Sequence, residues 1–246
     1  MRGLDGKDRM KDIIIRLENV SKIYQMGDVE VPALKEVSLE VKRGEFLAIS
    51  GPSGSGKSTM MNLVGCLDLP TNGTIFLDNE NIANLRESSL SQIRGKKIGF
   101  IFQQFNLLPT LTALENVMLP LELQDVDSKT AKGKALAVLK MVGLGDRVDH
   151  LPTQLSGGQQ QRVAISRALS IDPDIILADE PTGNLDSKTG EFIMEFLSRI
   201  HRDKKKTIIM ITHDLHLVKR AERVVYLKDG KIEKIIHKDE AGGAEK

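Results

Sequence analysis

The stretch GPSGSGKST at residues 51–59 constrains the fold of this chain more than any other. It follows a short apolar segment, EFLAIS (45–50), and it runs into KSTMMNLVGCL (57–67), where apolar residues recur at helical spacing. A G-x-x-x-x-G-K-[ST] pattern between a strand and a helix is that of a phosphate-binding loop. Its glycines let successive backbone N–H groups point at phosphate oxygens, and the helix N-terminus adds partial positive charge. We therefore expect a nucleotide site at this loop.

The side chains of this loop have distinct expected roles. Lys57 should reach the β- and γ-phosphates, Ser58 should ligate Mg²⁺, and Thr59 should support the phosphate contacts. The remaining residues that would cradle the phosphates are Gly51, Pro52, Ser53, Gly54, Ser55 and Gly56. The alternative is a glycine-rich turn without function, which the strand–loop–helix context makes a poor explanation.

Apolar strands alternate with helical segments along most of the chain. This alternation predicts an α/β fold with a mainly parallel sheet covered on both faces. The segment VSLEVKRG (37–44) alternates as an edge or meander strand would, and residues 223–236 are expected to form a hairpin turning at Asp229–Gly230. We expect one domain, 1–246, with an α/β core (13–103 and 160–236) that includes an N-terminal antiparallel β part, an inserted helical subdomain (about 104–159), and flexible ends (1–12 and 238–246).

Composition limits the partners that the chain can have. Lys and Arg number 35 and Asp and Glu 34, so the net charge of +1 argues against broad nucleic-acid binding. Cys66 is the single cysteine, which excludes a disulfide within the chain and fits a reducing cytosol. The polar start MRGLDGKDRMKD does not resemble a signal peptide. No apolar run approaches the roughly 20 residues of a membrane helix, so a membrane role would come through a partner.

Polar residues stand at the ends of three further predicted strands. DIILADE (174–180) ends in Asp179, a candidate Mg²⁺ ligand, and Glu180, a candidate base for a water facing the γ-phosphate. TIIMITH (207–213) ends in His213, which could contact the γ-phosphate or the attacking water. IGFIFQ (98–103) ends in Gln103, which could reach Mg²⁺ or water. Each of these residues alone has an ordinary structural explanation. Ligands bind beyond the carboxyl ends of parallel strands, so together they can build one site.

These motifs, in this order and spacing, resemble those of the ATP-binding cassette (ABC) ATPases. The resemblance rests on GPSGSGKST, Gln103, LSGGQ (155–159), ILADEP, NLD (184–186) and His213, and it extends from about Ile13 to Ile236. LSGGQ is the most discriminating part, because other P-loop enzymes lack it. Tyr24 lies where the family places an aromatic ring on adenine, although a structural tyrosine is also a reasonable explanation.

The resemblance implies a P-loop NTPase (RecA-like) core that binds ATP and Mg²⁺ and hydrolyses ATP. It also implies a homodimer packed head to tail around two ATP molecules. In it, Ser156, Gly157, Gly158 and Gln159 of one chain would cover the γ-phosphate held by Lys57 of the other. Asp186 would lie near the dimer seam, and loss of the γ-phosphate on hydrolysis would loosen the dimer.

Three stretches resemble the lipoprotein-release and macrolide-export group of the family: residues 65–73, 102–121 and 179–190. This implies an integral-membrane permease partner and a position on the cytoplasmic side of the cell membrane. A soluble ABC ATPase with an assembly or repair role remains an alternative. A P-loop kinase or GTPase is a second alternative, which LSGGQ and the lack of a guanine motif disfavour.

Overall fold

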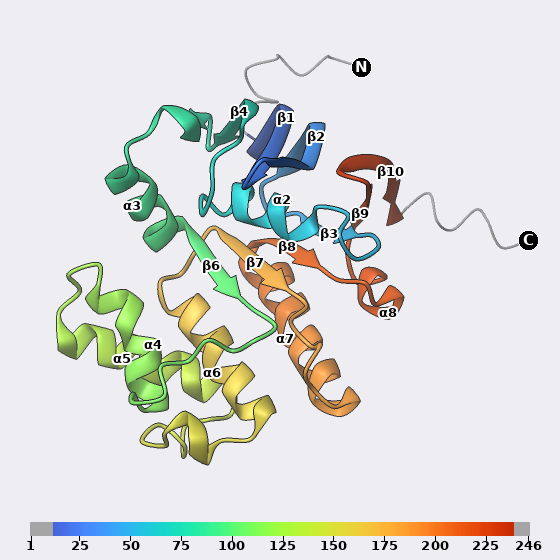
Figure 1. Ribbon diagram of the computed structural model, residues 1–246. Helices are drawn as coiled ribbons and strands as arrows, with labels where there is room; N and C mark the ends of the chain where they lie inside the picture. Colours follow the sequence, from blue (N-terminus) through green and yellow to red (C-terminus); the bar gives the residue numbers. More distant parts are fainter. Residues whose placement is uncertain (1–11, 239–246) are drawn as a thin grey trace, which may run out of the picture. The chain divides into compact units, whose positions relative to one another are not determined.

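The computed structural model describes residues 12–238, so the predicted flexible ends lie outside the described residues except for Asp12 and Lys238. The chain divides into two units (Figure 1). Unit 1 runs as far as Ser91 and resumes at Lys205, and unit 2 is Gln92–Lys204. Helix α3 (Glu87–Lys97) carries the chain from the first into the second. The domain boundaries expected from the sequence stay a prediction.

Unit 1 contains an antiparallel sheet in the order β2-β1-β4-β5. Its strands are β1 (Ile13–Met26), β2 (Val29–Lys42), β4 (Asn72–Leu77) and β5 (Glu80–Asn81), followed by the 3-10 turn η1 (Ile82–Asn84). The predicted edge strand is confirmed as part of β2, where Val37, Leu39 and Val41 are buried and their neighbours are exposed. Strands β1 and β2 are longer than the sequence pattern predicted, because both extend as far as a tight turn at Gly27, which has φ 62°.

Unit 1 also holds the strand that leads into the phosphate-binding loop. β3 (Phe46–Ser50) is fully buried and pairs in parallel with both β8 (Thr207–Ile211) and β9 (Arg223–Lys228). The predicted hairpin is confirmed by β10 (Lys231–His237), antiparallel to β9. Helix α2 (Lys57–Val64) buries Met60 and Leu63, and the short α8 (Leu215–Val218) follows β8.

Unit 2 combines a parallel strand pair with helices. β6 (Ile98–Ile101) pairs with β7 (Ile175–Asp179), and α6 (Gly157–Ser170) packs on β6. At Gly99 a Cβ atom would lie 2.6 Å from the Ala168 carbonyl oxygen, so glycine permits this close approach. The other elements are α4 (Ala113–Glu122), α5 (Ser128–Met141), the 3-10 turn η2 (Pro152–Gln154) and α7 (Ser187–Lys204).

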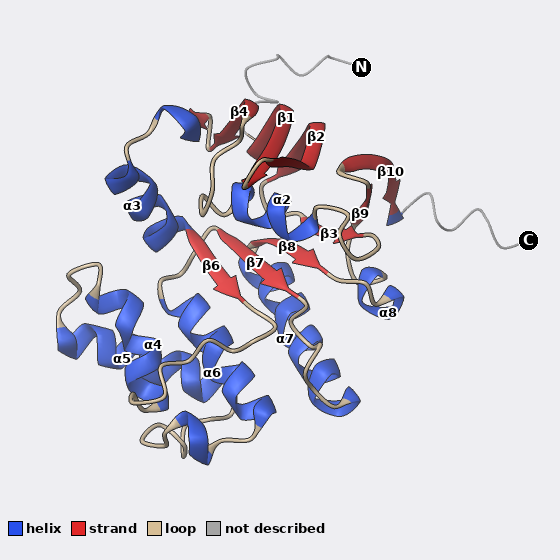
Figure 2. Cartoon of the chain, in the orientation of Figure 1, coloured by secondary structure: helices blue, strands red, loops and turns tan. Residues whose placement is uncertain are grey.

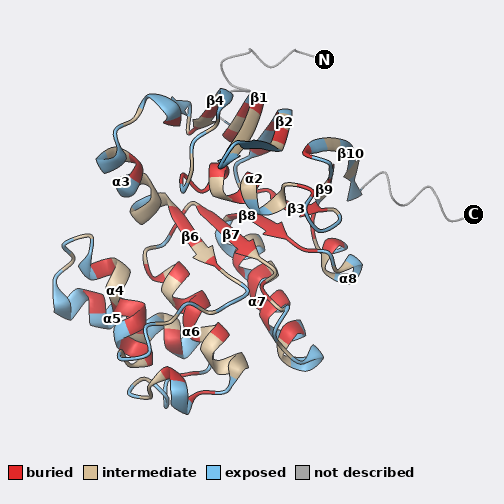
Figure 3. Ribbon diagram, viewed as in Figure 1, coloured by how far each residue is buried: buried red, intermediate tan, exposed pale blue. Residues whose placement is uncertain are grey.

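The two units together confirm the predicted fold class. The parallel pairs of β3 with β8 and β9, and of β6 with β7, supply the mainly parallel core, and the antiparallel β part lies at the N-terminal end of the chain (Figure 2). Helices α4, α5 and α6 pack on one another, as the inserted helical part requires. Figure 3 shows buried residues along β3, β7 and β8 and on part of α6 and α7, whereas β10 has no buried residue. The sequence pattern predicts neither α3 nor α8.

Candidate nucleotide site

The phosphate-binding loop lies between β3 and α2, as predicted, and its glycines are required by contact as well as by conformation. Gly51 has φ 150°, and a Cβ atom there would lie 2.1 Å from the Leu227 carbonyl oxygen. Gly56 has φ 101°, and its Cβ atom would lie 2.5 Å from the Ala33 carbonyl oxygen. The loop is therefore pressed against β9 and β2 at two points where no side chain fits.

Lys57 is held by the loop that it belongs to. Its ammonium group donates to the carbonyl oxygens of Gly51 and Pro52, at 2.9 and 2.7 Å. The N-cap of α2 is Gly56, which has no side chain to cap the helix, so the first N–H groups of α2 have no side-chain acceptor from that position. A lysine cation beside an uncapped helix N-terminus is a site for an anion. Exposed Ser58 lies in the first turn of the same helix.

The turn between β9 and β10 anchors this loop. The N–H of Gly230 donates to the Ser55 carbonyl oxygen at 3.1 Å, and the Gly230 carbonyl accepts from the N–H of Lys35 at 2.8 Å. The Ser55 hydroxyl is buried and has no hydrogen-bond partner among the described residues. The glycines, the lysine and the uncapped helix fit a bound phosphate, because they leave donors and positive charge without a matching anion.

Tyr24 lies in a small polar cluster in β1 and the loop after α2. Its hydroxyl donates to the Asp68 carboxylate at 3.0 Å, which also accepts from the Lys22 ammonium at 2.6 Å. Burial alone would raise the pKa of Asp68, but the hydrogen bonds from Lys22, the Leu69 N–H and Tyr24 outweigh it and lower that pKa. The Lys22 ammonium lies 5.0 Å from the centre of the Tyr24 ring. The ring is thus fixed in direction and half-exposed.

His213 and the phosphate-binding loop lie at the same edge of the parallel sheet, at the ends of β8 and β3. Ile49 of β3 pairs with Ile211 of β8, and the Thr212 N–H donates to the Ile49 carbonyl at 3.2 Å. The loop and His213 therefore both follow the carboxyl ends of neighbouring parallel strands, as the sequence predicted. His213 is exposed.

The other strand-terminal candidates lie in unit 2. Gln103 follows β6, and Asp179 and Glu180 stand at the end of β7, its parallel neighbour. The Asn184 amide donates to the Gln103 carbonyl oxygen at 3.0 Å, so the structure brings Gln103 against the loop that follows Glu180. Glu180 adopts φ 44°, a left-handed conformation that non-glycine residues rarely occupy.

The glycine pair of LSGGQ forms the first turn of α6. Ser156 and Gln159 make a reciprocal capping box: the Gln159 N–H donates to the Ser156 hydroxyl at 3.3 Å, and the Ser156 N–H donates to the Gln159 side-chain oxygen at 2.8 Å. A Cβ atom on Gly158 would lie 2.5 Å from the Thr189 methyl group, so glycine allows α6 to pack against α7. A Cβ atom on Gly157 would lie 3.7 Å from the Phe105 ring, which is an ordinary van der Waals contact.

Asp186 is tied to the first turn of α7. Its carboxylate accepts from the N–H and the hydroxyl of Thr189, at 3.0 and 2.6 Å. Those hydrogen bonds lower the pKa of Asp186, and its carboxylate remains exposed.

The predicted residues therefore form two sets, each organised within its own unit. Unit 1 holds Tyr24, the loop 51–59 and His213, and unit 2 holds Gln103, Asp179, Glu180, residues 156–159 and Asp186. Sequence reasoning missed Lys22 and Asp68, which orient Tyr24, because no local pattern links positions so far apart in the chain. It also missed Gln161, whose fully buried amide donates to the Pro181 carbonyl.

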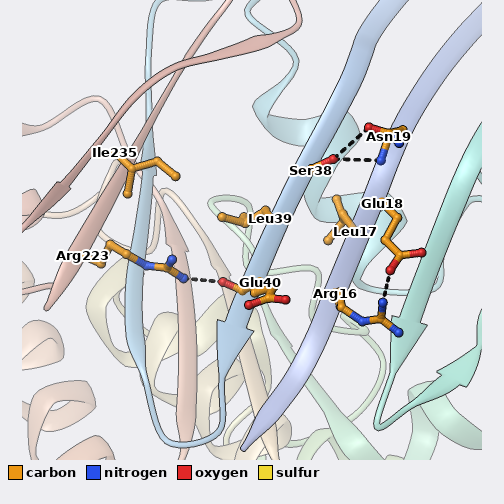
Figure 4. Close-up of a pocket in the computed structure, with 9 residues that line it drawn as sticks. All are labelled: Arg16, Leu17, Glu18, Asn19, Ser38, Leu39, Glu40, Arg223 and Ile235. Atoms are coloured by element: carbon orange, nitrogen blue, oxygen red, sulfur yellow. Dashed lines mark hydrogen bonds and ion pairs between the residues drawn. The ribbon is translucent and has the colours of Figure 1, made fainter. Parts of the chain in front are cut away.

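A pocket of about 570 Å³ lies elsewhere in unit 1, lined by residues of β1, β2, β9 and β10 (Figure 4). It contains none of the predicted site residues. The Arg16 guanidinium pairs with the Glu18 carboxylate, and Arg223 donates to the Glu40 carbonyl oxygen. Both guanidinium groups of the lining are already partnered, so this pocket is poorly suited to phosphate.

Comparison with known proteins decides the family. The ABC transporter family pattern matches residues 34–183. The chain belongs to the ABC transporter family. It is an ATP-binding cassette, an ATPase. In the described part of the chain, no helix combines the length and apolar character needed to cross a bilayer.

Similar proteins include whole cassettes and parts of larger proteins. The ABC transporter ATP-binding protein MJ0796 of Methanocaldococcus jannaschii is 53% identical over 90% of this cassette and 96% of the relative. A dimeric structure of the MJ0796 cassette in a post-hydrolysis state, bound to ADP and Pi, matches with a TM-score of 0.86 at 51% identity, covering 91% of this chain and 98% of that one. The macrolide export ATP-binding/permease protein MacB of Syntrophobacter fumaroxidans is 46% identical over 89% of this cassette and 31% of MacB.

Proposed function

We propose that this cassette is the ATP-hydrolysing subunit of an ABC transporter of the lipoprotein-release or macrolide-export type. It dimerises head to tail around two ATP molecules and drives a conformational change in an integral-membrane permease, which holds it at the cytoplasmic side of the cell membrane. The similarity to MacB supports this subgroup, because MacB is described as a macrolide export ATP-binding/permease protein. The dimeric structures of MJ0796 support the pairing.

The observation that carries the ATPase proposal is the uncapped N-terminus of α2 beside Lys57. These donors and this charge would bind the β- and γ-phosphates of ATP, and Tyr24, whose hydroxyl donates to Asp68, would stack on adenine. We assign Ser58, Gln103 and Asp179 to Mg²⁺, which neutralises charge on the phosphates. Hydroxyl, amide and carboxylate oxygens are ligand types that Mg²⁺ takes, and it keeps several waters beside few protein ligands. Among the described residues, no cluster of three or more His, Cys, Asp or Glu side chains competes for a metal.

Hydrolysis needs a group that orients or deprotonates the attacking water. We assign this role to Glu180 and a contact with the γ-phosphate to His213. Ser156, Gly157, Gly158 and Gln159 would cover the γ-phosphate bound by a second copy of the chain, and Asp186 would lie at the seam between the copies. A Cβ atom built on Gly157 would come no nearer than 3.7 Å to atoms outside its own helix turn, so packing among the described residues does not require glycine there.

The substitution Glu180→Gln tests the mechanism. It keeps the shape of the side chain and removes the carboxylate, so ATP binding should persist while hydrolysis falls by about 100-fold or more. Dimers should then accumulate with ATP and Mg²⁺ and separate with ADP, which light scattering after size exclusion would measure. The wild-type chain under the same conditions is the control. A Glu180→Gln chain that stays monomeric in saturating ATP and Mg²⁺ contradicts the shared site.

Membrane association tests the transporter assignment separately. The full chain, expressed in its own cell and purified after detergent extraction, should carry an integral-membrane permease with it. Purification with soluble assembly proteins and no membrane protein would instead support the alternative of a non-transport ABC ATPase.

A further inference from the structure

A buried glutamine links the helix that begins at LSGGQ to the loop that carries Glu180. Gln161 lies one turn into α6 and is fully buried. Its side-chain N–H donates to the Pro181 carbonyl oxygen at 2.6 Å, a short bond in a site without solvent. Pro181 is the residue immediately after Glu180. Both partners lie in unit 2.

The local backbone around Glu180 is one that the sequence does not favour. Glu180 has φ 44°, although it carries a side chain and precedes a proline. The proline ring favours an extended conformation for the residue before it. A backbone in such a region persists only where its surroundings hold it there. One such constraint within the loop is the bond from the Gly183 N–H to the Glu180 carbonyl at 3.0 Å.

The buried side chain of Gln161 makes one hydrogen bond among the described residues, through its N–H group. Its side-chain oxygen is buried and accepts no hydrogen bond among the described residues, so the amide is not part of a satisfied polar network. Burying a polar amide is unfavourable unless it is hydrogen-bonded, and the bond to Pro181 is the one that the side chain makes. A nonpolar side chain of the same length would fill the space without leaving an oxygen unpaired.

We propose that Gln161 is a positioning residue for ATP hydrolysis, which holds the Pro181 carbonyl and thereby keeps Glu180 in its left-handed conformation. The inference rests on the proposed role of Glu180. Without this bond, Glu180 relaxes toward the extended conformation and its carboxylate moves away from the attacking water. Because Ser156 caps α6, which begins at Gly157, Gln161 also couples the placement of the LSGGQ turn to the placement of Glu180 in the same chain.

The test removes the donor by two routes in the full-length chain. Gln161→Met keeps the length of the side chain without polar atoms, and Gln161→Glu keeps length and polarity but puts a carboxylate oxygen in place of the N–H group. Both should lower kcat for ATP hydrolysis about tenfold or more and leave the KM for ATP within about twofold. Ser166→Ala is the matched control, since Ser166 is buried on the same helix and its hydroxyl donates to the Arg162 carbonyl. This control should keep both constants.

A double substitution separates positioning from general damage. A residue that acts through Glu180 has nothing to position once the carboxylate is gone, so adding Gln161→Met to Glu180→Gln should change the residual single-turnover rate by less than about twofold. Independent, multiplicative losses overturn the inference, as does a kcat within twofold of wild type in both single variants. If Glu180→Gln itself leaves turnover intact, the proposed role of Glu180 fails. If Glu180→Gln stops turnover and both Gln161 variants sustain it, only the role of Gln161 fails.

Discussion

Two helices of this cassette begin at glycine-rich turns, and they end up with opposite arrangements of hydrogen bonds. The first turn of α2 has Gly56 at its N-cap and a lysine cation beside it. The first turn of α6 is capped by its own Ser156 and Gln159, which satisfy each other's N–H groups. The α2 turn is therefore open to an anion in the single chain. The α6 turn already uses the N–H groups of Ser156 and Gln159 in its own cap, so it offers a ligand fewer donors.

The glycines differ in the same way. In the α2 turn, Gly51 and Gly56 have positive φ and touch the backbone of neighbouring strands, so the fold itself demands glycine. In the α6 turn, Gly158 is required by Thr189 of the same unit, but Gly157 has ordinary space around it. The α2 turn therefore has the features of a phosphate site within one chain, whereas contacts among the described residues do not require glycine at position 157. Our proposal places a second copy there.

The largest expected effect comes from removing the charge at the first turn. Lys57→Ala should weaken ATP binding by about 100-fold, because the charge-assisted contact that we propose between Lys57 and phosphate is lost. Titration calorimetry with ATP and Mg²⁺ would measure it. Lys132→Ala, on the exposed side of α5, is the control and should bind ATP as the wild type does. Equal affinity in the two variants would mean that the α2 turn is not the phosphate site.

A matched pair of glycine substitutions tests the difference between the turns. Gly56→Ala should lower the free energy of unfolding by about 1–3 kcal/mol, because its φ is unfavourable and its Cβ atom meets the Ala33 carbonyl. Gly157→Ala should change that free energy by less than about 0.5 kcal/mol. Urea unfolding of the nucleotide-free chain would measure both.

The same pair has a second readout. In the Glu180→Gln background, Gly157→Ala should abolish dimerisation by ATP although the free chain is intact, since a methyl group would face the partner's γ-phosphate. Dimerisation that survives Gly157→Ala would contradict the proposed use of the α6 turn.

The smallest expected effect concerns Asp186, in the loop that precedes α7. The hydrogen bonds from Thr189 lower the pKa of Asp186, so its carboxylate form stabilises the folded state. This contribution is complete above the ordinary carboxyl pKa of about 4, and it is lost as the pH falls through the lower pKa of the folded chain. Asp186→Asn should therefore be slightly less stable than wild type at pH 7, and this difference should shrink as the pH falls below about 4. Asp28→Asn, at the exposed turn after β1, is the control; a difference that grows on acidification would contradict the assignment.

The sequence allowed the prediction of most features that depend on local pattern. The phosphate-binding loop, the strands leading to Gln103, Glu180 and His213, and the helix beginning after Ser156 all stand where periodicity and glycine placement put them. Elements with weak local signals were missed: α3 has few apolar residues, of which Leu90 is buried, and α8 is a single turn.

The sequence by itself determined the family and the chemistry, because motifs such as GPSGSGKST and LSGGQ act through backbone conformations that short glycine patterns specify. Only the tertiary structure decided which side chains support them. The bonds from Tyr24 to Asp68, from Gln161 to Pro181 and from Asn184 to Gln103 join residues 20 to 81 positions apart. Such pairs form when strands and helices pack, and no local pattern of residues records that packing.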